Sequence, residues 1–303
     1  MKTPVLIIAF NRPDSTRKVF EAVKSVKPSH LYVAIDGPRL ERGKKEQVLC
    51  QEVKDIFLNV DWPCEVKTLF NTRNLGCKRG PVSAINWLFE HEESGIILED
   101  DILPLNTFFS YCEELLNAYK DDHRIGLIAG SNLISNHKVI NSSYTYSNYT
   151  HIWGWATWRR AWKLYDIEMT DWKKLKYTNL IESKTDGTFL FKKFWSQFFD
   201  SAYFNDVNAW DYQWLFTCWK NDLLTIIPKH SLIQNIGFGP DATHTTKVPK
   251  YIQQMIVKEM PFPLISPKDV VVDKKNDLYI SKYFFTIGLF SVFKGYVKKI
   301  LNL

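Results

Sequence analysis

The stretch Ile96-Ile97-Leu98-Glu99-Asp100-Asp101 decides the fold of this chain. A short apolar run ends abruptly in three consecutive carboxylates. Because the buried strands of a parallel sheet are apolar along their whole length, the run predicts a central strand with the acids at its carboxyl end. In open α/β sheets, ligands bind at that end of the strands.

Three adjacent carboxylates repel one another, which is unfavourable unless a cation neutralises them. A hard divalent ion with oxygen ligands is suited to that role, and such an ion commonly bridges to phosphates. The acids therefore predict a metal–diphosphate site. The alternative is a solvated acidic turn, because Asp is common in turns. The position directly after a buried strand favours the metal site.

The composition fits a globular protein that binds anions rather than nucleic acid. The chain has 303 residues, enough for one large domain or two small ones, and 45% of them are apolar, which supports a substantial core. The formal charge of +6 is spread along the chain. Such a diffuse excess suits anionic ligands or an anionic membrane surface and does not indicate a nucleic-acid partner.

Cysteine usage and the absence of targeting signals lead us to expect a cytoplasmic protein. The five cysteines form no CxxC pair and are odd in number, so they predict reduced packing residues. The first residues lack the charged-then-apolar layout of a signal peptide. No apolar run approaches the ~20 residues that a membrane span needs.

The first half of the chain alternates strands with helices. We expect strands over 5–10, 31–35, 66–70 and a run that ends at 99, and helices over about 14–26, 44–59, 81–91 and 104–119. This alternation predicts an α/β fold with a mostly parallel sheet and helices on both faces.

The second half differs in composition. Nine of the eleven tryptophans follow residue 150, and no Gly-, Ser- or Pro-rich linker separates the halves. We therefore expect one domain over about 1–245, in which residues 131–245 pack on a sheet formed by about 1–130. Residues 246–303 would form a C-terminal extension.

Two further predicted strands end in groups that suit a nucleotide. Asn11 and Arg12 follow the first strand, and the Arg12 guanidinium could hold a phosphate in a bidentate fork or stack on a base. Asp36 ends the second strand and could accept a hydrogen bond from a base N–H or a ribose hydroxyl. Taken singly, Arg12 is explained by a helix start and Asp36 by a turn. Three such strand ends together predict a nucleotide site.

The segment 71–80 lies between a predicted strand and a predicted helix, and it reads Asn-Thr-Arg-Asn-Leu-Gly-Cys-Lys-Arg-Gly. Its glycines allow close backbone approach, and its cations, Arg79 among them, suit a diphosphate. The segment is neither a Walker loop nor a GxGxxG motif. A solvated basic loop is the alternative.

Four segments together resemble a glycosyltransferase of the GT-A fold. They read Val-Leu-Ile-Ile-Ala-Phe-Asn-Arg-Pro at 5–13, Ile-Asp-Gly-Pro at 35–38, Asn-Leu-Gly at 74–76 and Ile-Leu-Glu-Asp-Asp-Ile at 97–102. More narrowly, residues 4–245 are similar to the N-acetylglucosaminyltransferase I group and its bacterial relatives. The resemblance implies a nucleotide-diphosphate-sugar donor and a divalent metal, Mn²⁺ or Mg²⁺.

The resemblance also implies roles for single residues. The acids stand where GT-A enzymes carry their DxD motif, so Asp101 would be the direct metal ligand. Glu99 and Asp100 would contact the sugar, the ribose or metal-bound water, and Arg12 and Asp36 would hold the base. Eukaryotic members of the group carry a His near the start of the helix before the acidic strand. Here that position is a glycine or a neighbour, so uridine does not follow from the resemblance.

The segment 151–162 is rich in aromatic residues. Trp155, Trp158 and Trp162 are spaced i, i+3 and i+7, which predicts one face of a helix anchored in the core. Trp153 and Gly154 precede this expected helix and are better placed to line a sugar pocket, where flat rings stack on a pyranose. The resemblance agrees, because the family has a Gly-Trp element near the donor sugar and acceptor.

Asp211 is the candidate catalytic base. It lies in the aromatic segment 208–214, where partial desolvation should raise its pKa and suit it to deprotonate a hydroxyl. The alternative is an Asp at a helix N-terminus, favoured by the helix dipole. The resemblance implies the catalytic role, because related enzymes carry a Trp-Asp element whose Asp is the inverting base.

Two late segments add candidates. His244 lies in a polar, glycine-flanked loop and would be a second metal or diphosphate ligand by the resemblance, with His151 as the other candidate; a lone His is otherwise structural. Residues 283–301 form a basic amphipathic pattern, which predicts a helix that contacts an anionic membrane or docks on the core of the protein. Membrane contact would place the protein at the inner face of the cytoplasmic membrane.

We therefore expect a metal-dependent inverting glycosyltransferase that moves a sugar from a nucleotide-diphosphate donor to a hydroxyl of a glycan or lipid-linked acceptor. A sugar-1-phosphate nucleotidyltransferase is one alternative, although it should carry a Gly-rich triphosphate loop after the first strand, and none is present. A non-catalytic glycan-binding protein is the other, suggested by the tryptophans.

Overall fold

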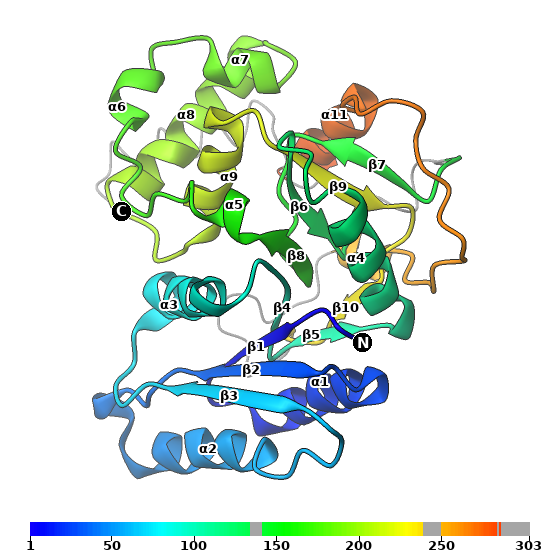
Figure 1. Ribbon diagram of the computed structural model, residues 1–303. Coiled ribbons are helices and arrows are strands. Elements are labelled where there is room, and N and C mark those ends of the chain that lie inside the picture. Colours follow the sequence, from blue (N-terminus) through cyan, green and yellow to red (C-terminus); the bar gives the residue numbers. More distant parts are fainter. Residues whose placement is uncertain (134–140, 239–249, 284, 286–303) are drawn as a thin grey trace.

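One large sheet with helices on both faces runs through the molecule, which confirms the expected α/β class (Figure 1). The computed structural model describes residues 1–133, 141–238, 250–283 and 285. The strands are β1 (Val5–Ala9), β2 (His30–Ile35), β3 (Glu65–Phe70), β4 (Ser94–Glu99), β5 (Ile102–Pro104), β6 (Ile125–Ala129), β7 (Tyr144–Ser147), β8 (Trp155–Trp158), β9 (Leu224–Pro228) and β10 (Ile233–Asn235). The helices are α1 (Pro13–Val26), α2 (Gly43–Ile56), α3 (Gly76–His91), α4 (Asn106–Ala118), α5 (Arg159–Trp162), α6 (Trp172–Leu175), α7 (Leu180–Lys184), α8 (Phe189–Tyr203), α9 (Asp211–Lys220), α10 (Lys250–Gln253) and α11 (Lys274–Tyr283).

The large sheet has the strand order β3-β2-β1-β4-β8-β6-β9-β7, and β10 and β5 form a second, two-stranded sheet. Strands β3, β2, β1 and β4 pair in parallel, as do β6 and β9. Strand β8 is antiparallel to both β4 and β6, and β7 is antiparallel to β9. The carboxyl ends of β1, β2, β4 and β6 therefore lie at one edge of the sheet, together with the start of β8.

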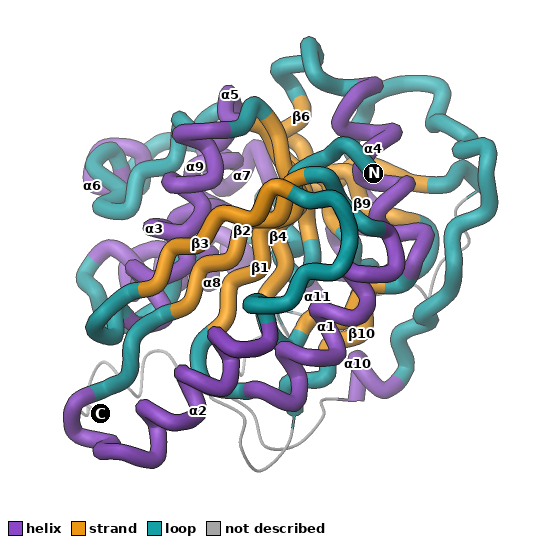
Figure 2. Tube along the Cα trace, turned by 60° about the horizontal axis from the view of Figure 1, so that its bottom comes forward, coloured by secondary structure: helices purple, strands orange, loops and turns teal. Residues whose placement is uncertain are grey.

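Alternate strand side chains enter two different cores. Val5 and Ile7 of β1 pack with residues of α1, α2 and α4, whereas Leu6 packs with residues of α3, α5 and α9. Figure 2 shows β3, β2, β1 and β4 side by side, with α3 on one side and α1 and α2 on the other. Burial on both faces explains why the strands of the first half read as continuous apolar runs.

A third core joins the second half to the C-terminal extension. Aromatic residues of α8 and α9 pack there with Ile280 of α11, which is fully buried. Asp277 of α11 accepts hydrogen bonds from the Ser147 hydroxyl and from the Asn148 backbone N–H, the latter at 2.9 Å. The described part of the extension thus packs on the same body, while the boundary near residue 245 remains a prediction. The helix expected over 283–301 lies, apart from residues 283 and 285, outside the described residues.

The expected helix over 155–162 is wrong, because residues Trp155–Trp158 form β8 and only Arg159–Trp162 are helical. Ala156 pairs with Ile96 of β4 on one side and with Ile128 of β6 on the other. Trp155 and Trp158 consequently lie in cores on opposite faces of the sheet. Pairing with two neighbouring strands outweighs a spacing that, taken alone, fits a helix.

Two expected helix starts also need correction. Helix α3 begins at Gly76 rather than at Pro81, because the backbone N–H groups of Leu75 and Gly76 donate to the distant Asp36 carboxylate. Helix α4 begins at residue 106 rather than at Pro104, because residues 102–104 form β5 and pair with β10. Both corrections come from partners far away in sequence.

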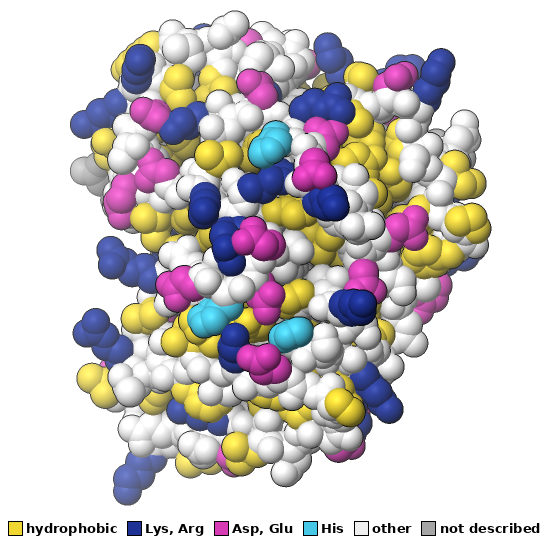
Figure 3. Space-filling model, in the orientation of Figure 1, with side chains coloured by type: hydrophobic (Ala, Val, Ile, Leu, Met, Phe, Trp, Pro, Cys, Tyr) yellow, Lys and Arg dark blue, Asp and Glu magenta, His cyan; other side chains and the backbone are white. Residues whose placement is uncertain are grey.

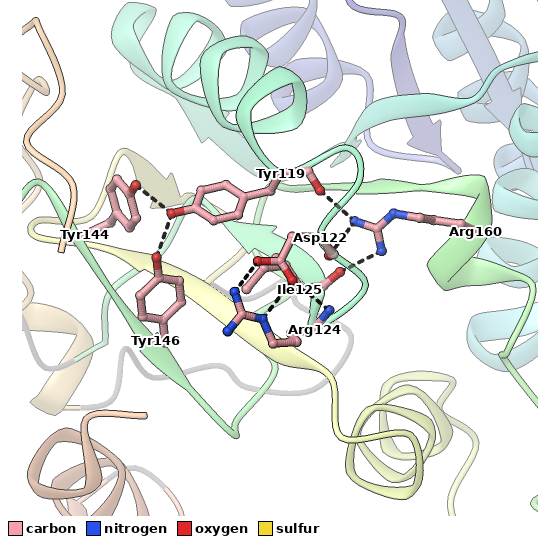
Figure 4. Close-up of polar contacts among 7 residues, drawn as sticks. All are labelled: Tyr119, Asp122, Arg124, Ile125, Tyr144, Tyr146 and Arg160. Carbon is pink, nitrogen blue, oxygen red and sulfur yellow. Dashed lines mark hydrogen bonds and ion pairs between the residues drawn. The ribbon is translucent and has the colours of Figure 1, made fainter. Parts of the chain in front are cut away.

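The turn after α4 is fastened to α5 by Arg160 (Figure 4). The Arg160 guanidinium donates to the carbonyl oxygens of Tyr119 and Ile125, each at 2.9 Å. The Tyr119 hydroxyl in turn lies 2.8 Å from that of Tyr144 and 2.6 Å from that of Tyr146, both on β7. These contacts connect the turn between α4 and β6 to α5 and to β7.

The charged side chains form no single patch on the face drawn in Figure 3, where Lys and Arg are interspersed with Asp and Glu. Among the described helices, none has the length and apolar character that crossing a bilayer requires.

Candidate functional site

A cavity of about 360 Å³ opens at the carboxyl ends of β1, β2 and β4. Much of its wall is apolar, and its polar groups converge from both halves of the chain. The residues proposed from sequence that line it are Arg12, Asp36, Glu99, Asp100, Asp101, Trp153 and Asp211. The structure therefore brings these seven residues together, although their individual roles remain predictions.

The acidic strand end is bridged by one guanidinium. Arg12 Nη2 lies 2.6 Å from Asp100 Oδ1, and Arg12 Nη1 lies 2.7 Å from Asp101 Oδ2. The Phe10 backbone N–H donates to the other oxygen of Asp100 at 3.1 Å. Because α1 starts directly after β1, Arg12 stands at the sheet edge beside the end of β4, and its side chain can span both carboxylates.

The acids outnumber the cation that neutralises them. Burial, reinforced by the charges of Asp101 and Asp100, raises the pKa of Glu99 to about 8. Burial also raises the pKa of Asp100 to about 6, although Arg12 opposes the shift. Asp211 adds to the negative field at Glu99 from the second half of the chain. A further cation at this point would relieve the repulsion among the carboxylates.

The described side chains do not by themselves enclose a metal ion. No group of three or more His, Cys, Asp or Glu side chains able to hold an ion occurs within the described ranges. Asp101, the predicted metal ligand, lines the cavity, and its side chain is 16% exposed. Phosphate oxygens of a bound donor would have to supply the remaining positions. His244, the other proposed ligand, lies outside the described residues.

The segment after β10 covers Asp101. The Ile236 backbone N–H donates to the Asp101 carbonyl at 2.8 Å, which continues the pairing of β10 with β5. A Cβ on Gly237 would lie 2.1 Å from Asp101 Oδ2, so a larger residue here would require the Asp101 side chain to move. Phe238 follows and meets the ring of Trp153 edge to face, with the centroids 6.3 Å apart.

Asp36 is held very differently from the acids of β4. Five nitrogen groups donate to its two oxygens at 2.9–3.2 Å. They belong to the backbone of Gly37, Leu75 and Gly76 and to the side chains of Asn71 and Asn74. The carboxylate therefore organises the loop between β3 and α3.

Asp211 is the first residue of α9, as the helix N-terminal alternative expects, and it also lines the cavity. The preceding Trp210 stacks on Trp155, with the ring centroids 5.8 Å apart and an angle of 24° between the planes. The aromatic surround expected of Asp211 is thus present. Its position at both the helix start and the cavity is compatible with a catalytic base.

Three residues proposed from sequence do not line the cavity. Asn11 Nδ2 donates to Glu46 Oε1 at 3.0 Å, and Arg79 is exposed on α3. Gly154 has a φ of +59°, and a Cβ on it would lie 2.5 Å from the Ile233 side chain, so this glycine has a packing role. Direct nucleotide-sugar contacts from these three remain predictions without support from the cavity.

His151, the second histidine candidate, is buried and does not line the cavity. Neither of its ring nitrogens has a hydrogen-bond partner among the described residues. Burial lowers its pKa to about 4, so the ring is neutral at physiological pH.

Several cavity residues were not singled out from the sequence. The polar and aromatic ones include Phe10, Asn71, Asn208, Trp210, Asn235 and Phe238. Asn71 and Asn208 lie inside segments that the sequence analysis marked, and Asn71 directly follows a strand, which is the signal that could have found it. Asn208 and Asn235 reach the cavity only through the packing of the second half on the sheet.

Comparison with known proteins does not assign a family. No family model matches the chain, and no curated protein matches it. Among solved structures it is similar to the galactosyltransferase LgtC in complex with donor and acceptor sugar analogues, with 10% identity, a TM-score of 0.36, and coverage of 71% of this chain and 69% of that one. The glycosyltransferase GlyE of Streptococcus pneumoniae has 13% identity, a TM-score of 0.33, and coverage of 80% and 58%.

A UDP-glucose pyrophosphorylase complexed with UDP-glucose is also similar, with 9% identity, a TM-score of 0.28, and coverage of 50% of this chain and 64% of that one. At these identities and TM-scores, the likenesses establish neither an activity nor a family. The function is therefore argued from the site.

Proposed function

We propose that this protein is a metal-dependent inverting glycosyltransferase that uses a nucleotide-diphosphate sugar. The observation that carries the proposal is the shared cavity, which the acidic end of β4, Arg12 and Asp211 line together with aromatic side chains. Carboxylates at a strand end suit a metal–diphosphate pair, and a separate carboxylate from the second half suits a base.

The first half would bind the donor. Asp101 would hold Mn²⁺ or Mg²⁺, which when bound supplies Lewis-acid stabilisation of the charge that develops on the leaving diphosphate. Arg12 can offer its guanidinium to the donor's phosphates or base, because its side chain is 27% exposed and faces the cavity. Glu99 and Asp100 would accept hydrogen bonds from donor hydroxyls.

The second half would bind and activate the acceptor. Trp153 can stack on the apolar face of a sugar ring, because it lines the cavity and is only partly buried. Asp211 would take the proton of the acceptor hydroxyl as the hydroxyl attacks the anomeric carbon. That carbon gains oxocarbenium character, as in other glycosyl transfers. Attack from the face opposite the diphosphate inverts the configuration.

The acceptor would be a glycan or a lipid-linked sugar. A lipid-linked acceptor would give purpose to contact between residues 283–301 and an anionic membrane at the cytoplasmic face. Vesicle sedimentation of the full chain, with and without anionic lipid, tests that contact.

A panel of nucleotide sugars with Mn²⁺ tests the activity. We expect one donor to release its nucleoside diphosphate and to raise the thermal midpoint, and chelation of the metal should abolish both effects. Release of pyrophosphate from a nucleoside triphosphate and a sugar phosphate would instead identify a nucleotidyltransferase. Glycan binding without release of any nucleotide product would identify a binding protein.

A further inference from the structure

The carboxylate of Asp36 has little capacity left to read a nucleotide base. An ionised carboxylate offers about four lone-pair sites. Five nitrogen groups of the protein already donate to Asp36, three of them from the backbone. A base N–H could reach Asp36 only by displacing one of these donors.

By accepting these hydrogen bonds, Asp36 holds the loop between β3 and α3 in place. The backbone N–H groups of Leu75 and Gly76 both donate to it, and these residues stand at the start of α3. The loop also packs closely on the turn after β2, because a Cβ on Gly37 would lie 2.5 Å from backbone atoms of Arg73. Asp36 therefore acts on the cavity through the loop it organises.

Asn71 is the neighbour with unused hydrogen-bonding capacity. Its Nδ2 donates to Asp36 Oδ1 at 3.2 Å, and because a carboxylate only accepts, this contact fixes the nitrogen of the amide toward Asp36. The amide oxygen accepts no hydrogen bond from the described residues, and a second N–H remains on Nδ2. Asn71 lines the cavity, as do apolar residues from the ends of β2 and β3.

We infer that Asn71 discriminates between nucleotide bases in this cavity, while Asp36 is a positioning residue that fixes Asn71 and the loop. This inference rests on the proposed function. One acceptor and one donor on the same amide match a base that presents an N–H beside a carbonyl oxygen or ring nitrogen. Asp36 orients the Asn71 amide. This orientation decides which side of the amide presents the N–H donor to the base and which side presents the oxygen acceptor.

The variant Asn71→Leu tests the first part, with Asn74→Leu as the matched control. Asn74 also donates to Asp36, at 2.9 Å, but it does not line the cavity. The probes are the diphosphates of uridine, cytidine, thymidine, adenosine and guanosine with Mn²⁺, measured by calorimetry. We expect the ratio of Kd values between the weakest and the tightest diphosphate to fall about tenfold in Asn71→Leu, and to stay unchanged in Asn74→Leu.

Hydrogen exchange of Asp36→Asn tests the second part without any nucleotide. We expect the amides of Leu75 and Gly76 to lose protection. Because the Asn71 amide also loses the carboxylate that orients it, the ratio of Kd values among the five diphosphates should fall as it does in Asn71→Leu. An unchanged ratio in Asn71→Leu, or equal affinities for all five in the wild type, would overturn the role of Asn71. Intact protection of both amides in Asp36→Asn would overturn the positioning role. If the wild type binds no diphosphate, the proposed function and the base-reading role both fail, while the exchange result still decides what Asp36 does.

Discussion

The strands β2 and β4 both end in carboxylates that line the same cavity, yet the two ends are held by opposite means. Asp36 after β2 accepts from five neutral nitrogen groups of its own neighbourhood. Asp100 and Asp101 after β4 share one guanidinium, and they lie beside Glu99, whose pKa is raised to about 8 chiefly by burial.

The difference separates a carboxylate that builds the site from carboxylates that remain available to a ligand. A partly buried charge that is fully hydrogen-bonded to neutral donors, as Asp36 is, is a stable structural element. Crowded acids with one counter-ion are costly until another cation arrives. The same residue type at equivalent strand ends therefore serves two purposes, and the surrounding donors show which one applies.

The largest expected effect is on the end of β4. Asp101→Asn removes the predicted metal ligand, so metal-dependent turnover of the nucleotide sugar should fall by ~10³-fold or more, since a metal supplies several kcal/mol of stabilisation. The exposed Asp14→Asn in the first turn of α1 is the control and should retain full activity. Steady-state assays with Mn²⁺ measure both. Full activity in Asp101→Asn would remove the distinction between the two strand ends.

Asp211 extends the comparison to the second half of the chain. Asp211→Asn should cut turnover by ~10²–10⁴-fold, the usual contribution of a general base. The Kd for the nucleoside diphosphate should not change, because the donor would be held by the first half. Asp206→Asn, an exposed acid just before the same segment, serves as the control. Normal sugar transfer by Asp211→Asn would refute the assignment of the base.

Arg12→Gln tests how much the guanidinium stabilises the acids at the end of β4. Removing the guanidinium leaves the β4 acids without their counter-ion, so the free energy of unfolding should fall by roughly 2–4 kcal/mol. Part of this loss should return with Mn²⁺. Arg124, which is exposed and lies 2.7 Å from the partly buried Asp122, provides the control Arg124→Gln, which should cost less than about 1 kcal/mol. Urea unfolding measures all of these changes.

Glu99→Gln should produce the smallest effect, and its sign depends on pH. The folded protein holds the Glu99 proton up to a pKa of about 8, well above the ordinary value of 4.5. The stability that this proton contributes is complete below pH 4.5 and is lost as the pH rises through 8. Without metal, the free energy of unfolding should therefore fall by roughly 2 kcal/mol less in the variant than in the wild type between pH 6 and pH 9. Parallel pH dependences in urea unfolding would contradict the raised pKa.

The first half of the fold was largely predictable from sequence. Its strands are buried on both faces, so each reads as an apolar run, and the helices between them read as amphipathic segments. The acids after β4 were informative because three adjacent carboxylates repel one another unless a cation neutralises them.

The second half was less predictable because long-range pairing decides it. Strand β8 is four residues long and owes its conformation to β4 and β6. The contact of Gly237 with Asp101 joins residues far apart in the sequence, and so do four of the five donors on Asp36. Local spacing cannot reveal which carboxylate already has its hydrogen bonds, and that property distinguishes Asp36 from Asp101.

The stacked rings beside the cavity have a practical consequence. Trp210 forms part of the cavity wall and stacks on Trp155, which contacts Trp162, whose ring centroid lies 5.2 Å from that of Trp214. Indoles at such separations exchange excitation energy, so a quencher beside one of them reduces the fluorescence of all four. Binding of a nucleotide in the cavity should therefore be measurable as a change in intrinsic tryptophan fluorescence, without a dye or a label.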